Sequence, residues 1–164
     1  MDKVVEKKYA NQVKSELLKN LKPYGFKRTK PTFYTRLKED RIEFIHIHKF
    51  SFGPSFRVHI GARFYCDSFE AVALNGIDSD GFRRKYNLSY GSPEESVVKC
   101  VEEIMKFIRC EGFRWFEDWM DPIELLDDED SPIIRFKNEY LKFQAGEYDI
   151  EKVTLSRMLL GIKD

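Results

Sequence analysis

Residues 24–65 read YGFKRTKPTFYTRLKEDRIEFIHIHKFSFGPSFRVHIGARFY, and this stretch decides the fold. Apolar and polar side chains alternate in it over three runs, which is the pattern of half-buried β-strands. The charged turn at 38–40 and the turn around Gly53-Pro54 separate the runs, so the strands are predicted to form an antiparallel meander. The predicted strands cover residues 32–37, 41–50 and 56–65.

Helical patterns lie on both sides of this meander. From Lys3 to Leu21, apolar residues recur every three or four positions, which places them on one face of an amphipathic helix. Ser92-Pro93-Glu94-Glu95 has the sequence of a capping box, and the apolar stripe behind it predicts a second helix that ends at Gly112. Further helices are predicted over 113–120, 132–144 and 149–162, the last two as an antiparallel pair.

The fold class that these patterns predict is α+β, within a single domain. At 164 residues the chain is long enough for one hydrophobic core. We expect an N-terminal helix, an antiparallel meander of three or four strands, helices packed on one face and a C-terminal helical hairpin. The fourth strand is placed in FRRKYNLSY (82–90). Residues 1–115 form the predicted sheet-containing core, and 116–164 form a helical extension.

Composition excludes several classes of protein. No apolar run is long enough for a signal peptide or a membrane span, so we expect a cytoplasmic protein without a membrane partner. Lys and Arg together number 28, as do Asp and Glu, so no overall charge attracts nucleic acid. Cys66, Cys100 and Cys110 lack CxxC spacing, which favours reduced thiols. No hydrolase, nucleotide-loop, zinc-protease or dinucleotide motif occurs, and no cofactor is predicted.

All three histidines lie on the two longest predicted strands. If the connecting turn has four residues, at 51–54 or 52–55, residues whose numbers add to an odd total pair, and Ile45 and Ile47 face the core. A turn of three or five residues would instead bury two of the histidines. In the four-residue register one face of the sheet carries three histidines and two arginines, namely His46, His48, Arg57, His59 and Arg63.

Three interpretations of this face compete. Two histidines on one strand and a third opposite could hold zinc, but the face has arginines and no carboxylate from either strand, so we predict no metal site. The arginines suit a phosphate or carboxylate ligand, with His46, His48 and His59 as acid, base or anion-holding groups. In the third interpretation, these side chains only pair with carboxylates or pack under aromatic rings.

Other candidate contacts are short. Lys27-Arg28-Thr29-Lys30 and Arg83-Arg84-Lys85-Tyr86 are basic runs that could touch phosphates, yet such runs are usually solvated, and we do not expect a nucleic-acid partner. The acidic run 127–130 lacks the spaced oxygens of a calcium loop and is predicted to be a solvated loop. Trp115 and Trp119 are predicted to anchor helix packing, whereas exposed tryptophans there would mark a protein-binding face.

A resemblance to a known family is carried by GFKR at 25–28, TFYTR at 32–36 and IHIHKFSFGPSFRVHIGARF at 45–64. These blocks are similar to the bacterial family named domain of unknown function 4304, whose members share a GFKR…TFYR block and a strand–FG–strand hairpin. The resemblance extends over about residues 12–115 and implies a small soluble bacterial α+β domain. Members commonly carry Gln or Asn where this chain has His48 and His59, so the resemblance assigns no reaction to the histidines.

Two classes of function follow from these patterns. The absence of a catalytic motif and the aromatic-rich helices favour a non-catalytic binding or regulatory domain, immunity-like in kind, that recognises a protein or a small anionic ligand. The alternative is an enzyme that acts on phosphoryl or carboxylate groups through the histidines, with Arg57 and Arg63 as clamps. The enzyme requires a concave pocket over these side chains, whereas the binding protein requires only an accessible surface.

Overall fold

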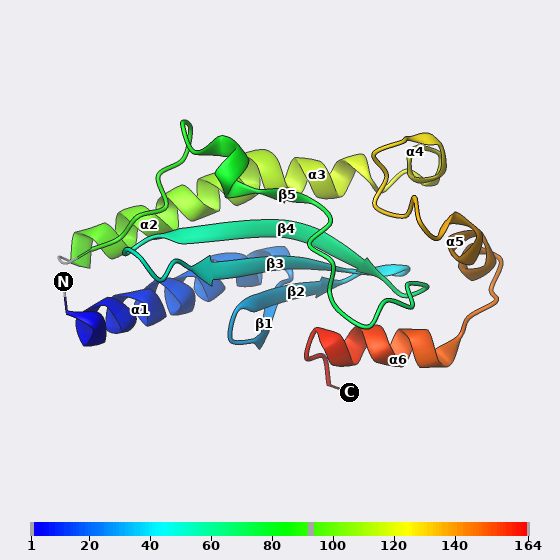
Figure 1. Ribbon diagram of the computed structural model, residues 1–164, viewed down its shortest axis with the longest axis horizontal. Helices are drawn as coiled ribbons and strands as arrows, with labels where there is room; N and C mark the ends of the chain where they lie inside the picture. The colour runs from blue at the N-terminus through cyan, green and yellow to red at the C-terminus, as the bar shows by residue number, and fades with distance from the viewer. Residues whose placement is uncertain (1, 92–93, 164) are drawn as a thin grey trace.

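The computed structural model describes residues 2–91 and 94–163 and confirms the α+β class (Figure 1). Its α-helices are α1 (Lys3–Leu21), α2 (Glu94–Phe107), α3 (Phe113–Asp118), α4 (Pro122–Asp127), α5 (Lys137–Gln144) and α6 (Ile150–Leu159). Its strands are β1 (Lys27–Lys30), β2 (Phe33–Leu37), β3 (Arg41–Lys49), β4 (Phe56–Phe64) and β5 (Ile77–Asp78). Shorter helical turns are η1 (Lys22–Tyr24), η2 (Ser79–Phe82) and η3 (Ile108–Gly112). The five strands form one antiparallel sheet in chain order, as a meander does.

The N-terminal helix has the bounds that the apolar periodicity predicts. The carboxylate of Asp2 caps it by accepting a hydrogen bond from the Val4 N–H at 2.8 Å. After Leu21 the chain leaves the helix through η1 and reaches Gly25, whose φ of 89° lies in the left-handed region that favours glycine. The buried face of α1 packs on the sheet through Ala10, Val13, Leu17 and Leu21.

The three long strands agree with their predicted bounds to within one residue at each end, and the two short strands do not follow the sequence pattern. The basic run 27–30, for which the sequence predicted no strand, pairs with β2 as a charged edge strand. The fourth strand predicted over 82–90 is wrong in position, because this segment meets the sheet only at a bridge between Ser55 and Ser89. The edge beside β4 is taken instead by β5.

A glycine allows β5 to approach β4 so closely. A Cβ atom at Gly76 would lie 1.8 Å from the Ile60 carbonyl oxygen, so no other residue fits there without a shift of the backbone. The side chain of Asn75 extends the ladder, because its amide accepts from the Ala62 N–H at 3.1 Å and donates to the Ala62 carbonyl at 2.8 Å. The edge of β4 is therefore closed by a segment with little strand-like sequence.

Helices cover both faces of the sheet, rather than the one face predicted. The main core lies between the inner face and the helices α1 and α2, which contact each other. The two helices run in the same direction (Figure 1). At the far end of the inner face, Phe64 packs under α4 and α5. On the outer face, α6 covers one end of the sheet, where Leu160 packs with Ile42 and Phe44. This end is called the covered half below, and the end that carries His46, His48, Arg57 and His59 is called the open half. The helix α5 packs mainly at the far end of the inner face and reaches the outer-face cluster through Phe143, whereas α6 lies on the outer face. The two helices do not lie antiparallel, as the expected hairpin would (Figure 1).

The second predicted helix does not end at Gly112. It continues through η3, a π-turn in which the Phe113 N–H donates to the Ile108 carbonyl, and joins α3. A Cβ atom at Gly112 would lie 3.0 Å from Cδ1 of Ile60, so this glycine permits close packing of the helix on β4 instead of stopping it. The predicted cap at Ser92-Pro93 lies outside the described residues. Within 2–91 and 94–163, no helix combines the length and apolar character needed to span a membrane.

Candidate functional site

The connection between β3 and β4 decides which side chains share a face, and the four-residue turn is confirmed. The Phe50 N–H donates to the Ser55 carbonyl at 3.0 Å, which leaves residues 51–54 as the turn. Ile45 therefore pairs with Ile60 on the inner face. The outer face receives the five predicted residues, His46, His48, Arg57, His59 and Arg63.

Arg63 lies in the covered half of the outer face and is only 2% exposed. Its Nε donates to Oγ of Ser156 at 2.9 Å, and its two Nη atoms donate to the carbonyls of Ala71 and Asp67 at 3.0 and 2.9 Å. The Asp67 carboxylate also lies 3.6 Å from Nη1. Arg63 thus joins β4 to α6 and to the loop 66–76, and this placement removes it from the candidate site.

Arg57 lies in the open half of the outer face, but it is paired with acidic residues that the strand pattern did not place there. Its Nη2 donates to the Asp78 carboxylate at 2.7 Å, and its Nε lies 3.4 Å from Oδ2 of Asp80. Asp80 in turn pairs with Arg83 at 3.0 Å. Two carboxylates thus balance two guanidinium groups, so the expected cationic surface is locally neutral.

The histidines of the open half are mostly enclosed. Oδ2 of Asp78 lies 3.3 Å from Nε2 of His59, yet burial lowers the pKa of this imidazole. Burial, assisted by the neighbouring histidines, lowers the pKa of His46 to about 4. The His46 and His59 rings lie 6.0 Å apart, and Nδ1 of each is buried without a hydrogen-bond partner among the described residues. His48 alone is exposed, with its ring edge-on to Phe50.

This geometry limits the chemistry of the histidine face. An imidazole with a pKa of about 4 is a weak general base at neutral pH. None of the main cavities of the described chain has a histidine in its wall, although one of them is lined by Asp80 and Arg83, beside the Arg57 ion pairs. Across residues 2–91 and 94–163, no three or more His, Cys, Asp or Glu side chains gather in a way that could hold a metal. Burial raises the pKa of the Cys66 and Cys100 thiols to about 12, which disfavours a thiolate nucleophile.

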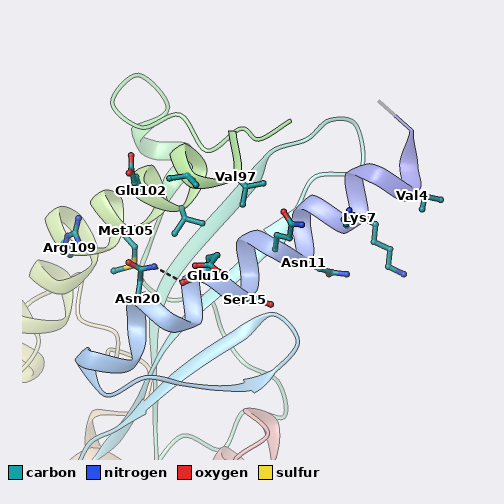
Figure 2. Close-up of a pocket in the computed structure, with 14 residues that line it drawn as sticks. Val4, Lys7, Asn11, Ser15, Glu16, Asn20, Val97, Glu102, Met105 and Arg109 are labelled. Carbon is teal, nitrogen blue, oxygen red and sulfur yellow. Dashed lines mark hydrogen bonds between the residues drawn. The ribbon is translucent and has the colours of Figure 1, made fainter. Parts of the chain in front are cut away.

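A larger candidate surface, which the sequence did not predict, is the groove between the outward sides of α1 and α2, called the helix groove below (Figure 2). Its volume is about 1150 Å³. The floor is apolar and comes from Val97, Val101 and Met105 of α2, which are nearly buried, while Val98 beside them is 54% exposed. The α1 side of the groove is mostly polar and is formed by Lys7, Lys8, Asn11, Gln12, Ser15, Glu16 and Asn20, together with Val4, which is 75% exposed.

The charges around the helix groove are not balanced. Lys7, Lys8 and Arg109 make no ion pair with another described residue. Glu16 is paired with Lys19 at 2.8 Å, which leaves Glu102 as the one unpaired acid among the described residues of this lining. The rim therefore presents three uncompensated cations against one carboxylate. The only signal for this surface in the sequence is Val98, which widens the apolar stripe of α2 beyond what the core uses.

The TFYTR block contains an arginine with a structural role. Arg36 of the TFYTR block places its guanidinium 4.5 Å from the centre of the Phe26 ring, and its Nε donates to the buried Glu43 carboxylate at 2.8 Å. Its Nη1 donates to the Tyr24 carbonyl at 2.9 Å, next to the left-handed Gly25. These contacts hold β2 against β3 and against the segment 24–26 that connects α1 to β1, so Arg36 has a structural role.

The remaining sequence candidates also have packing roles. Trp115 and Trp119 are half-buried and pack against the cluster at the far end of the inner face, which confirms their prediction as helix anchors. The run 127–130 ends α4 and continues as a turn. Compared with known proteins, the chain matches no family model, no curated protein and no solved structure.

Proposed function

We propose that this protein is a non-catalytic binding domain that recognises another protein through the helix groove. The observation that carries the proposal is the combination of an apolar floor with unpaired cations on its rim. An apolar strip ringed by charged groups is the usual composition of a protein-binding surface, because the apolar part supplies affinity and the rim supplies orientation. A regulatory or immunity-like role is consistent with such a surface, since covering a partner requires no reaction.

The dimensions of the helix groove favour a macromolecular ligand. Small-molecule sites usually enclose about 300–1,000 Å³ and bury most of their ligand. The helix groove is larger, at about 1150 Å³, and runs along the outside of two helices. Its walls also lack the elements of a catalytic centre, because no histidine or cysteine is among the described residues that line it. A partner with a matching ridge would fill this space better than a small solute.

A second candidate function, an enzyme for phosphoryl or carboxylate substrates, has one observation in its favour. Nδ1 of His46 and Nδ1 of His59 are buried without partners in the described chain, and such atoms occur at functional sites. Against it, Arg57 is paired with Asp78, and Arg63 is enclosed. The proposed clamps are therefore occupied, and the binding domain is the better-supported function.

Position-specific photocrosslinking tests the proposal. A benzoylphenylalanine at Ser15, which is exposed on the rim, should crosslink a discrete partner when the purified protein is irradiated in native lysate. The same group at Ile123, which is exposed on α4, is the control and should not capture this partner. Combining the Ser15 probe with Val98→Asp should abolish the product, because a carboxylate is placed on the apolar strip. A product that persists with Val98→Asp, or that forms equally from Ile123, would refute binding in the groove.

A further inference from the structure

Resting on the helix groove as the binding surface, we infer that its occupant is an acidic amphipathic helix, with one apolar stripe and carboxylates near both ends. The stripe would lie on the α2 floor, and the carboxylates would face Lys7 and Lys8 at one end and Arg109 at the other. Figure 2 shows Lys7 near the beginning of α1, while Arg109 and Asn20 lie toward the opposite end of the groove. Shape, floor and charge lead separately to this occupant.

The shape of the groove favours a helix over an extended segment. The lining residues of α1 extend from Val4 to Asn20, so the groove is about 24 Å long at the rise of an α-helix. Both walls are helices whose backbone groups bond within their own ladders, so they offer no free edge to an extended peptide. A helix satisfies its own backbone and needs only side-chain contacts, which is the helix-in-groove mode of recognition.

The floor of the groove specifies an apolar stripe. Val97, Val101 and Met105 follow one another at intervals of four residues, so they form a single ridge along α2. Each is less than 7% exposed, while Val98 beside the ridge remains open to solvent. A helix with large apolar residues at three- and four-residue spacing would pack against this ridge and cover Val98.

The charges specify acidic flanks and set their separation. Along α1, Lys7 and Lys8 precede Asn20 by about 12 residues. Arg109 lies toward the same end of the groove as Asn20, so the cations at the two ends are separated by about this length of helix. A partner would therefore meet a cation at both ends if its carboxylates were about 12 residues apart. Glu102 lies on the α2 side between the two ends, which disfavours a carboxylate at the middle of the partner.

A second copy of this chain is a poorer occupant than such a helix. The outward side of α1 carries Lys7, Asn11 and Ser15, so a second α1 would bring polar and cationic side chains to an apolar, cationic groove. Nucleic acid and anionic lipid would satisfy the cations but would leave the ridge of α2 without an apolar partner. The inference is therefore specific to an acidic helix and can be separated from these alternatives.

The test uses synthetic fluorescent peptides of about 18 residues, which span the groove when helical. The first peptide has a leucine stripe and glutamates about 12 residues apart. The second replaces the glutamates by lysines, and the third keeps the composition but breaks the stripe. Fluorescence anisotropy should show saturable binding of the first peptide to the full chain and much weaker binding of the other two. Binding of the first should also weaken as salt is raised.

Charge reversal locates the contact. Lys7→Glu combined with Lys8→Glu should weaken the acidic peptide about tenfold and allow the lysine peptide to bind, because a reversed rim reverses the preference. Lys99→Glu is the matched control, since this exposed lysine lies on α2 outside the groove lining, and it should leave both peptides unchanged.

The outcomes separate the inference from the proposed function. If a Ser15 crosslink forms and is blocked by Val98→Asp, but the acidic peptide does not bind or does not discriminate against the lysine peptide, the groove is used by a different partner and the acidic helix is wrong. If no groove-dependent crosslink forms, the proposed function itself fails. Two further results would overturn the acidic helix as the occupant. One is a concentration-dependent dimer that Val98→Asp abolishes. The other is tighter binding of a short DNA duplex or of anionic vesicles than of the peptide.

Discussion

Two arginines on the same strand and the same face of the sheet lie in different environments. Arg63 is enclosed by Ser156, Ala71 and Asp67, while Arg57, six residues earlier on β4, lies in the open half and pairs with Asp78. The alternation of β4 gives both the same direction, so the pattern predicts the face correctly. It does not predict which half is covered, because the cover comes from the loop 66–76 and from α6.

The substitution with the largest expected effect is Arg63→Met, which retains the length of the side chain and removes its hydrogen-bond donors. We expect a loss of about 3–5 kcal/mol in the free energy of unfolding, because buried carbonyls, the Ser156 hydroxyl and Asp67 lose their partner. Urea unfolding monitored by tryptophan fluorescence measures it. Arg57→Met is the matched control and should cost about 1 kcal/mol or less, because its ion pairs are partly exposed. Equal losses would contradict the division into two halves.

The pH dependence of stability tests how far His46 is enclosed in the open half. The pKa of His46 is lowered from 6.5 to about 4 in the folded chain, so the unfolded state binds the additional proton between these values. The contribution of neutral His46 to the free energy of unfolding is complete above pH 6.5. It is lost as pH falls toward 4, by at most about 3 kcal/mol. His59, whose pKa is also lowered, adds to this loss in the same direction.

The measurement compares urea midpoints between pH 7 and 4.5 for the wild type and His46→Gln, which cannot titrate. His48, His59, Arg57 and Asp78 stay in place in both proteins, so the difference in slope belongs to His46. The wild type should lose more stability on acidification than the variant does. Parallel curves would indicate that His46 is not enclosed as the structure describes.

A third change tests how closely β5 approaches β4 at the edge of the sheet. Gly76→Ala would place a Cβ atom 1.8 Å from the Ile60 carbonyl oxygen, so β5 must move away from β4. We expect a loss of about 2 kcal/mol, together with faster hydrogen exchange at the amides of β4 that face this edge. Gly53→Ala is the control, because a Cβ atom at that position meets nothing within 4 Å. Unchanged exchange in β4 would contradict the close approach of β5.

The sequence predicted those parts of the fold that depend on local pattern. The bounds of α1 follow from its periodicity, and the pairing of His46 with His59 follows from the length of one turn. The position of β5 could not be predicted, because it depends on the contacts that Gly76 and Asn75 make with the edge of β4. These contacts arise only in the folded chain and leave no periodicity in the segment itself.

The candidate surfaces were harder to predict for a related reason. The neutralising carboxylates of Asp78 and Asp80 come from a segment with no clear periodicity, so the histidine face looked cationic in the sequence. The helix groove arises between two helices about ninety residues apart, one of which, α1, has no apolar stripe on its outward side. Charge balance and concavity depend on tertiary neighbours, which alternation along a single strand or helix does not contain.

The smallest expected effect distinguishes the exposed histidine from the enclosed pair. His48→Ala should change the free energy of unfolding by less than about 0.5 kcal/mol, because His48 is exposed and its contact with Phe50 is a single edge-on ring pair. His59→Ala should cost more, about 1–2 kcal/mol, because it removes a largely buried ring and its contact with Asp78. Thermal unfolding at pH 7 resolves the difference. Since the two residues share one face of the sheet, unequal costs would confirm that enclosure, and not strand alternation, determines what each histidine does.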